Sequence, residues 1–212
     1  MIYNEISLNL QKGKAKVVRD LVRQAIEEGF PAEEILNQGL LAGMMIIGDK
    51  FRNNEVYVPE VMVAARAMNQ GINLLKPHLT AAGSGTVGKV CLGTVKGDLH
   101  DIGKNLVKMM MEGRGLEVID MGVDVEPAAF VETAKRENCQ IIALSALLTT
   151  TISSMADVVK EAEAAGIRDQ VKIMIGGAPV SDAFAKRIGA DAYTLDAATA
   201  AEVALGYCKK ES

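Results

Sequence analysis

One histidine stands in a setting that suits metal chemistry. His100 follows Asp98 at a spacing of two, between Gly97 and Gly103, where an apolar run gives way to a helical pattern. A carboxylate that fixes one ring nitrogen of a histidine sets its tautomer and makes the other nitrogen a better metal ligand. The spacing alone leaves two interpretations open, a metal ligand and a hydrogen-bonded loop histidine.

Two further loops that follow predicted strands add polar and small residues. Residues 145–151 supply Ser145, Leu147 and three consecutive threonines, and Gly176-Gly177 follow the next apolar run. Ligands of open α/β sheets bind outside the carboxyl ends of the strands, where such loops meet. Together the three loops offer one ligand, several hydroxyl groups and a stretch of backbone without side chains.

The elements that must position these loops alternate in type after residue 88. Short apolar runs predict strands, and each is followed by a helical pattern. Five such units predict an α/β domain, a five-stranded parallel sheet of the flavodoxin-like kind with helices on both faces. The predicted strands are residues 89–95, 116–121, 140–147, 171–175 and 190–195, and the predicted helices are residues 104–114, 127–137, 152–165, 181–188 and 197–208.

Every periodic segment before residue 80 is helical. Apolar stripes cover residues 2–10 and 17–26; Pro31 fits the first turn of a third helix that reaches Phe51, and Pro59 opens a fourth that reaches Leu79. Four amphipathic helices joined by short turns predict a four-helix bundle. We therefore expect a helical domain at residues 1–80, a small and polar linker at 81–87, and the flavodoxin-like domain at 88–212.

Composition argues against several classes of partner and site. A net charge of -4 without a long basic run disfavours nucleic acid. No apolar run approaches the ~20 residues of a membrane span, and the first residues lack the order of a signal peptide. The 3 cysteines have no CxxC spacing, which disfavours a disulfide framework or a zinc site and favours a reducing compartment. We expect a cytoplasmic protein with no nucleic-acid or membrane partner.

The three loops resemble the cobalamin-binding domain that carries an Asp-x-His-x-x-Gly motif followed by Ser-x-Leu and Gly-Gly motifs. The helical part resembles the cap domain of the corrinoid proteins that serve methyltransferases, including the cobalamin module of methionine synthase. The resemblance covers nearly the whole chain and extends to stand-alone corrinoid carriers. The matching residues are Asp98 to Gly103, Ser145 to Leu147, Gly176-Gly177, Gly48 to Phe51, Val58-Pro59-Glu60 and Ala64 to Met68.

The resemblance implies that cobalamin is the cofactor and that His100 is the lower axial ligand of its cobalt, in place of the cofactor's own dimethylbenzimidazole. It further implies that Asp98 binds the far ring nitrogen and that Thr151 continues this relay. Release of the histidine on reduction to cobalt(I) would then be coupled to proton uptake. Taken without the resemblance, Thr151 is equally an ordinary residue at a strand end or helix start.

The resemblance also implies a slot along the sheet for the displaced nucleotide tail and a cover over the upper corrin face. Ser145 would bind the benzimidazole and Gly176-Gly177 would leave room for the tail, although a glycine pair also suits a plain tight turn. Gly103 would let the loop turn into its helix. Taken without the resemblance, Asp98 and Asp101 are each suited to cap that helix, and for Asp101 we prefer this interpretation. The implied cofactor-binding positions are Phe51, Val58, Gly97, Asp98, His100, Asp101, Ile102, Gly103, Ser145, Leu147, Thr149, Gly176, Gly177 and Tyr193.

Phe51 and Val58 match the two positions over the upper corrin face. The family more often has leucine or another bulky residue where this chain has Val58, so the cover would be looser here. Phe51 also continues a helical stripe and is equally compatible with a place in the core of the bundle. Tyr193 would form the outer wall of the slot.

The implied function is that of a methyl carrier, not of a complete enzyme. The protein would accept a methyl group on cobalt(I) from a substrate-specific methyltransferase and pass it as methylcobalt(III) to an acceptor methyltransferase, with a reductive activase rescuing oxidised cobalt. The alternatives are a cobalamin-sensing regulator or cobalamin-carrier module without methyl transfer, a phosphoacceptor domain on the same sheet and an adenosylcobalamin mutase subunit. A regulator would need a DNA-binding domain, a phosphoacceptor would need an aspartate in place of Ser145, and a mutase subunit would lack the cap that carries Phe51.

Overall fold

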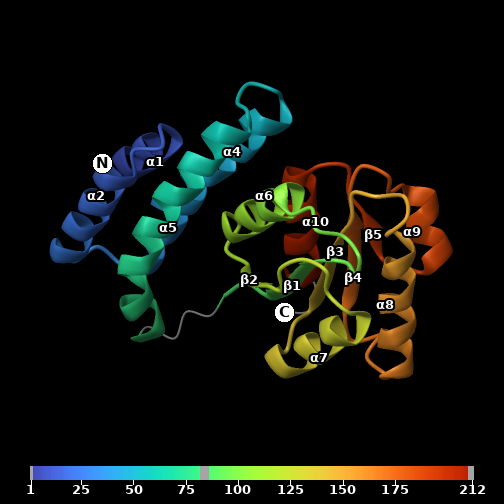
Figure 1. The fold of residues 1–212 in the computed structure, drawn as a ribbon. Helices are drawn as coiled ribbons and strands as arrows, with labels where there is room; N and C mark the ends of the chain where they lie inside the picture. Colours follow the sequence, from blue (N-terminus) through green and yellow to red (C-terminus); the bar gives the residue numbers. More distant parts are fainter. Residues whose placement is uncertain (1, 82–85, 210–212) are drawn as a thin grey trace. The chain divides into compact units, whose positions relative to one another are not determined.

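The computed structural model describes residues 2–81 and 86–209, in a helical part and an α/β part (Figure 1). The chain divides into two compact units, Met1–Thr86 with Gly113–Gly115, and Val87–Glu112 with Leu116–Ser212. Buried apolar side chains fill the interior of each unit. Among the described residues, no helix combines the length and the apolar character that crossing a membrane requires.

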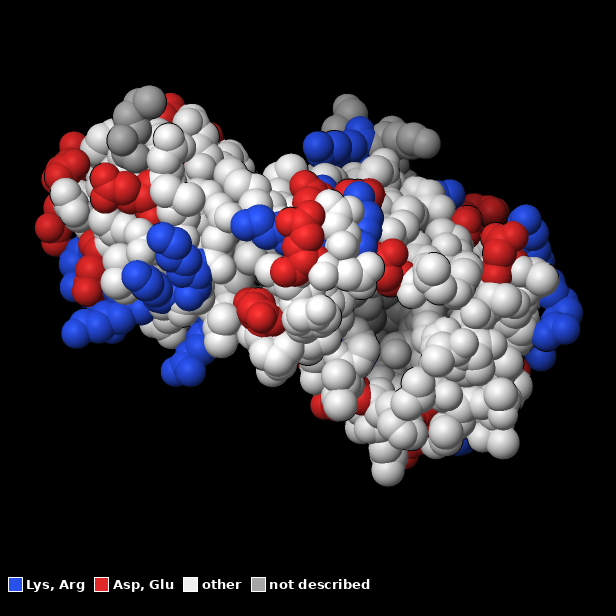
Figure 2. Space-filling model, turned by 90° about the horizontal axis from the view of Figure 1, so that it is seen from above, with Lys and Arg blue, Asp and Glu red and all other residues white. Residues whose placement is uncertain are grey.

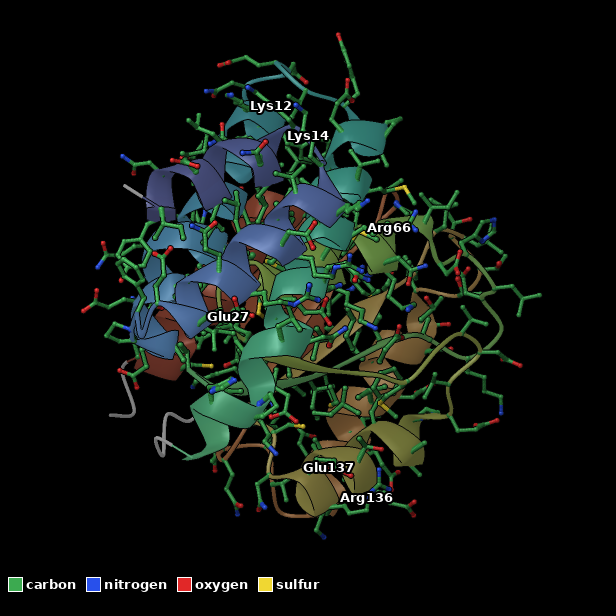
Figure 3. The ribbon with its side chains drawn as sticks, turned by 90° about the vertical axis from the view of Figure 1, so that its left-hand side faces the viewer. Lys12, Lys14, Glu27, Arg66, Arg136 and Glu137 are labelled. Atoms are coloured by element: carbon green, nitrogen blue, oxygen red, sulfur yellow. The ribbon has the colours of Figure 1, made fainter. Side chains whose placement is uncertain are left out.

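The helical unit contains the four helical segments that the sequence predicts, and its third segment has an irregular course. The helices α1 (Ile2–Gln11) and α2 (Ala15–Glu27) are joined by a tight turn that carries Lys12 and Lys14 (Figure 3). The third segment consists of α3 (Ala32–Glu34), a π-helical stretch η1 (Ile35–Leu41) and α4 (Ala42–Arg52), and the fourth is α5 (Val58–Ala81). Pro31 stands at the N-cap of α3 with ψ 130°, so it precedes the first turn in which the sequence analysis placed it.

The core of the helical unit forms where the predicted stripes face each other. Val22, Leu40 and Met68, from three different segments, are fully buried. Gly71 of α5 lies so close to Leu40 that a Cβ atom there would approach its methyl groups to 2.8 Å. Glycine at this position therefore allows the segments to pack tightly.

The sheet unit has the predicted alternation of strands and helices. Its strands are β1 (Lys89–Thr94), β2 (Glu117–Asp120), β3 (Ile141–Ser145), β4 (Lys172–Gly176) and β5 (Ala192–Tyr193). Its helices are α6 (Ile102–Glu112), α7 (Pro127–Glu137), α8 (Ser153–Ala164), α9 (Asp182–Ile188) and α10 (Ala197–Lys209). All strand pairs are parallel and the order is β2-β1-β3-β4-β5, which is the flavodoxin-like order.

Helices cover both faces of this sheet (Figure 1). The helices α6 and α10 pack against each other, and α7 and α8 form a second pair. The last two residues of α7, Arg136 and Glu137, form an ion pair (Figure 3). Leu144 and Ile175 belong to the same buried cluster as residues of α7 and α8, so these side chains lie on that face of the sheet.

The register of the strands aligns three residues at their carboxyl ends. Thr94 of β1 is paired with Ser145 of β3, and Ser145 is paired with Gly176 of β4. Successive side chains of a strand point to opposite faces. Because Leu144 and Ile175 face α7 and α8, the row Thr94–Ser145–Gly176 lies on the face covered by α6 and α10.

The predicted linker at residues 81–87 is only partly described. Residues 82–85 lie outside the described part of the chain. The helix α5 continues to Ala81, so the first residue assigned to the linker is helical.

Candidate functional site

The three loops with chemically useful residues meet at the carboxyl edge of the sheet. The backbone N–H of Val95 donates to the carbonyl of Ser145, and the N–H of Ala146 donates to the carbonyl of Gly176. These bonds continue the ladder beyond the ends of β1 and β3. The loop that carries Asp98 and His100 is thereby joined to the loop that follows β3.

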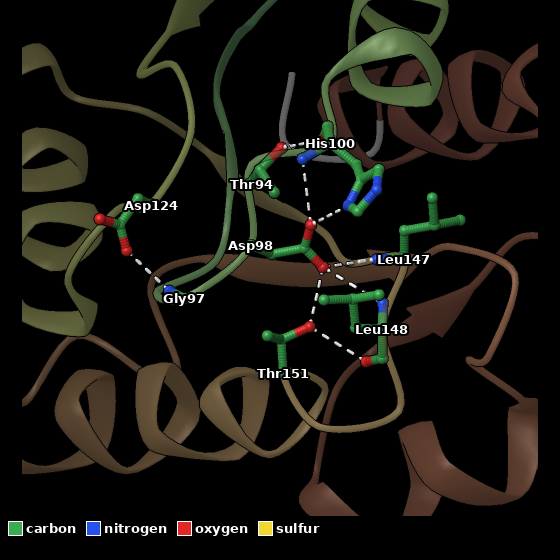
Figure 4. Close-up of polar contacts among 8 residues, drawn as sticks. All are labelled: Thr94, Gly97, Asp98, His100, Asp124, Leu147, Leu148 and Thr151. Carbon is green, nitrogen blue, oxygen red and sulfur yellow. Dashed lines mark hydrogen bonds and ion pairs between the residues drawn. The ribbon is translucent and has the colours of Figure 1, made fainter.

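Asp98 is the centre of the polar network at this edge (Figure 4). Its side chain is fully buried. Oδ1 accepts from the backbone N–H of His100 at 3.0 Å and lies 2.8 Å from its ring Nδ1. Oδ2 accepts from the N–H groups of Leu147 at 2.7 Å and Leu148 at 3.2 Å, and from the hydroxyl of Thr151 at 2.8 Å.

The network keeps this buried carboxyl group ionised. Burial by itself would raise the pKa of Asp98, because it disfavours the charged form. The N–H groups of Leu147 and His100, the Thr151 hydroxyl and the His100 ring all donate to the carboxylate, and together they hold its pKa well below the usual range. Asp98 is therefore a fixed negative charge behind His100.

His100 contacts Asp98 through Nδ1, and its other ring nitrogen, Nε2, points away from the carboxylate. Since an ionised carboxylate only accepts hydrogen bonds, Nδ1 carries the proton and the lone pair of the neutral ring is on Nε2. About half of the side chain is exposed, at 51%. Figure 4 shows the second ring nitrogen on the side away from Asp98. Nε2 is thus available to an electrophile that approaches from outside.

Thr151 extends the network by one hydroxyl group. The side chain is buried, and its Oγ1 lies within hydrogen-bonding distance of Asp98 Oδ2 at 2.8 Å and of the Leu148 carbonyl at 3.0 Å. One hydroxyl proton serves these two acceptors. Thr149 is exposed two residues earlier, and Thr151 is the member of the threonine run that reaches the carboxylate.

The surroundings of His100 are apolar and exposed. Leu99 precedes it on the loop, and Ile102, the first residue of α6, is 77% exposed. Leu147 and Leu148 expose their side chains on the neighbouring loop while their N–H groups bind Asp98. Figure 2 shows a mostly uncharged surface over the sheet unit at its lower right. Exposed apolar side chains around a polar centre suit a large flat ligand.

The two glycines at the end of β4, Gly176 in the strand and Gly177 directly after it, have different structural roles. A Cβ atom on Gly176 would meet only the carbonyl of Thr194, at 3.5 Å, so this position opens onto free space. Gly177 has φ 134°, and a Cβ atom there would lie 1.8 Å from the carbonyl oxygen of Ala146. The backbone itself therefore requires Gly177, whereas Gly176 and the half-buried Ser145 leave room on the α6 and α10 face.

Three further residues of the sequence prediction, Tyr193, Gly103 and Asp101, have the following places in the structure. Tyr193 packs against the buried cluster of α7 and α8, on the face opposite to Ser145, and so lies outside the row Thr94–Ser145–Gly176. Gly103 lies inside α6 without a positive φ, and the turn of the loop occurs at Gly97 with φ 82°. Asp101 starts α6: its carbonyl accepts from the Asn105 N–H, and its carboxylate accepts from the Asn105 side chain.

Phe51 and Val58 lie in the helical unit. Phe51 is the residue before the end of α4 and Val58 is the first residue of α5, so the two flank one turn. Both side chains are partly buried.

Three contacts at the site were missed by the sequence analysis. The hydroxyl of Thr94 donates to the carbonyl of His100 at 2.9 Å, and the carboxylate of Asp124 accepts from the N–H of Gly97 at 2.7 Å. Nζ of Lys104 lies 2.6 Å from Oδ1 of Asp120. The rule that loops after parallel strands share one edge applies to the loop after β2 as well, and it would have drawn attention to Asp124.

The donor set does not form a site for a free metal ion. Within residues 2–81 and 86–209, no group of three or more His, Cys, Asp or Glu side chains is arranged to hold one. A single imidazole with a fixed tautomer instead suits a metal whose other ligands arrive with it, as in a macrocycle.

Two family models and several known proteins match this chain. Residues 88–205 match the family model described as B12 binding domain, and residues 2–76 match a second model with the same description. The chain is 42% identical over 185 residues to the dimethylamine corrinoid protein 3 of Methanosarcina acetivorans, covering 86% of this chain and 87% of the relative. It is 40% identical over 180 residues to the trimethylamine corrinoid protein of Methanosarcina barkeri, covering 84% of this chain and 83% of the relative.

Solved structures show the same architecture. A chain in the crystal structure of the methanol:cobalamin methyltransferase complex MtaBC from Methanosarcina barkeri matches with a TM-score of 0.90 and 27% identity, over 98% of this chain and 80% of that one. A cobalamin-binding protein from Desulfitobacterium hafniense matches with a TM-score of 0.79 and 29% identity, over 97% of this chain and 98% of that one.

Proposed function

The chain belongs to the methyl-carrying corrinoid proteins, whose cofactor is a cobalamin, and on this premise we propose that His100 is the lower axial ligand of the bound cobalt. The observation that carries the proposal is the contact of 2.8 Å between His100 Nδ1 and the buried carboxylate of Asp98. It fixes the tautomer and leaves Nε2 free for the metal. His100 would hold the cofactor, and the bound corrinoid would supply the cobalt that carries the methyl group.

Asp98 and Thr151 fix the orientation of the His100 ring. The ionised carboxylate of Asp98 accepts from Nδ1 of His100 at 2.8 Å, which keeps the ring in one orientation and presents Nε2 to the cofactor. The Thr151 hydroxyl donates to the other carboxylate oxygen and keeps the charge in place. Asp98 and Thr151 would therefore hold His100 ready to bind the metal of the cofactor.

Ser145 and Gly176 are the proposed floor of a slot for the nucleotide tail, at the end of the row that begins with the buried Thr94. Ser145 offers a hydroxyl group there, and Gly176 opens onto free space. Gly177 contributes by letting the loop pass close to Ala146. We assign no part of the slot to Tyr193, because its side chain packs on the other face of the sheet.

Phe51 and Val58 are proposed to cover the methyl-bearing face of the cofactor. Their support is the residue-by-residue resemblance to the family's cap and their shared position at the turn between α4 and α5. Valine is smaller than the leucine that the family more often has at this place, which favours a looser cover.

The proposed partners are a substrate-specific methyltransferase, an acceptor methyltransferase and a reductive activase. Relatives named for dimethylamine and trimethylamine favour a methylated amine as the source of the methyl group. We also propose a cytoplasmic location, which is supported by the three cysteines of the sequence, because they lack CxxC spacing.

Reconstitution with cobalamin tests the proposed function. The purified chain is loaded with hydroxocobalamin, desalted, and its visible spectrum is compared between the wild type, His100→Ala and His78→Ala. His78 is the other histidine of the chain and serves as the matched control. We expect the wild type and His78→Ala to share one spectrum and His100→Ala to differ. A wild-type chain that fails to bind cobalamin, or three identical spectra, would contradict the proposal.

A further inference from the structure

Asp124 is an exposed residue that the proposed function leaves without a role, although it contacts the His100 loop twice. It lies on the segment between β2 and α7. Its Oδ1 accepts from the N–H of Gly97 at 2.7 Å, and its own N–H donates to the carbonyl of Asp98 at 3.0 Å. Figure 4 shows its side chain directed at Gly97 from the side opposite to His100.

The two contacts join two turns that both need an unusual backbone. Asp124 has φ 53° and Gly97 has φ 82°, so both adopt the left-handed region. Aspartate and asparagine are among the few residues other than glycine that tolerate it. The carboxylate of one turn thus closes onto the amide of the other.

The segment that carries Asp124 is itself firmly attached to the sheet. The N–H of Val125 donates to the carbonyl of Thr94, and the N–H of Thr94 donates to the carbonyl of Gly122, both at 3.0 Å. Val95 and Val125 form a parallel bridge. Asp124 is therefore anchored to the end of β1 on both of its sides, and it can serve as a fixed point for the loop that follows β1.

We propose that Asp124 is a positioning residue that holds the turn at Gly97 and thereby aims the Asp98 carboxylate at His100. The inference rests on the proposed function, because it matters only if His100 must be held for a ligand. The backbone conformation of Gly97 and Asp98 sets the position of the buried Asp98 carboxylate. If the Gly97 N–H loses its carboxylate partner, the turn can rotate, and the short contacts of Asp98 loosen.

Three substitutions separate the carboxylate from the backbone conformation. Asp124→Gly keeps access to positive φ and removes the acceptor. Asp124→Asn keeps both the backbone preference and an acceptor oxygen. Asn138→Gly is the matched control: Asn138 also has a positive φ, 55°, and it caps the other end of α7, away from the site.

The first measurement uses the cofactor-free protein. Amide hydrogen exchange of Gly97 and His100, followed by NMR, reports whether the turn and the Asp98 contact remain closed. In Asp124→Gly we expect exchange at both amides to be about tenfold faster, the effect of losing one hydrogen bond to a charged group. Asp124→Asn should stay within about threefold of the wild type, and Asn138→Gly should leave both amides unchanged.

The second measurement uses the protein loaded with cobalamin. The ratio of histidine-bound to histidine-free cobalt(II), from electron paramagnetic resonance, should fall about three- to tenfold in Asp124→Gly and recover in Asp124→Asn. Thermal unfolding of the variants checks that all of them fold. If Asn138→Gly lowers the melting temperature and the ratio by as much as Asp124→Gly, the effect is one of stability and the inference is overturned.

The two measurements also separate this inference from the proposed function. A wild-type protein without histidine-bound cobalt refutes the proposed function, while the exchange of Gly97 and His100 still decides whether Asp124 holds the loop. Equal exchange in Asp124→Gly and the wild type overturns the inference, whatever the cobalt signal shows.

Discussion

Nζ of Lys104 lies 2.6 Å from Oδ1 of Asp120, and only 2% of the lysine side chain is exposed. This pair ties the first turn of α6, just after His100, to the end of β2. The Asp120 carboxylate also accepts from the N–H of Gly122 and lies 3.3 Å from Nζ of Lys108. The His100 loop is thus fixed after the histidine by Lys104, and before it by the contacts of Gly97 and Asp98.

Lys104→Met should destabilise the protein markedly. The substitution removes the buried ammonium group that pairs with Asp120 and leaves the partly buried Asp120 carboxylate with one partner fewer. We therefore expect the free energy of unfolding to fall by about 1–3 kcal/mol. Lys108→Met is the matched control, because Lys108 is more exposed and its loss should cost only about 0–1 kcal/mol. Urea denaturation of both variants measures the difference. Equal losses would show that Lys104 has no special role.

Acid should destabilise the cofactor-free protein partly through Asp98. The pKa of this group is lowered in the folded state, so its ionised form contributes stability above the unfolded value of ~3.9, and this contribution is lost as the pH falls through the folded value. The wild type should therefore lose stability steadily below about pH 4. Asp98→Asn should be less stable at neutral pH and should show a shallower loss in acid. Urea denaturation between pH 7 and pH 3 tests this, with Asp101→Asn as an exposed carboxylate control; parallel curves for wild type and Asp98→Asn would be the contrary outcome.

The hydroxyl of Thr151 should contribute measurably to stability. Thr151→Val keeps the shape of the side chain but leaves the buried Asp98 carboxylate with one donor fewer, at a cost of about 1–2 kcal/mol. Thr151→Ser keeps the hydroxyl and should lose less. Thermal unfolding of the two variants distinguishes them, and a valine variant as stable as the serine variant would remove Thr151 from the network.

Gly176 and Gly177 should respond differently to alanine. Gly177→Ala forces a Cβ atom against the carbonyl of Ala146 in a backbone region that alanine avoids, so we expect a loss of at least about 3 kcal/mol or poor folding. Gly176→Ala meets nothing closer than 3.5 Å and should fold normally, but it should weaken cobalamin binding by narrowing the slot. Denaturation and cobalamin titration of both variants test this. Normal cobalamin affinity in Gly176→Ala would argue against the slot.

The sequence predicted the architecture because its strongest signals are local. Burial alone explains the apolar run of β3, which is covered on both faces, and the helical stripes before residue 80. The structure confirms both the α/β sheet and the helical bundle. The π-helical stretch Ile35–Leu41 was not predicted, because an apolar stripe fits α and π geometry nearly equally over so short a segment.

At the site, the sequence indicated which residue types are present but not which residues are in contact. The pair Asp98 and His100 is close in sequence and was predicted as a pair. The support from Asp124, from the Thr94 hydroxyl and from the N–H of Leu148 depends on loops that are distant in sequence and meet only in the folded sheet. Likewise, the reason for Gly177 became visible only when Ala146 was placed beside it.

The coordination of cobalt by His100 is tested most directly by electron paramagnetic resonance of the cobalt(II) form bound to protein labelled with ¹⁵N-histidine. A histidine nitrogen on the metal changes the superhyperfine pattern from triplets to doublets on labelling, because ¹⁴N has spin one and ¹⁵N has spin one half. We predict doublets in the labelled wild type and in labelled His78→Ala, and no such change in His100→Ala. Triplets in the labelled wild type, from the cofactor's own benzimidazole, would contradict the account.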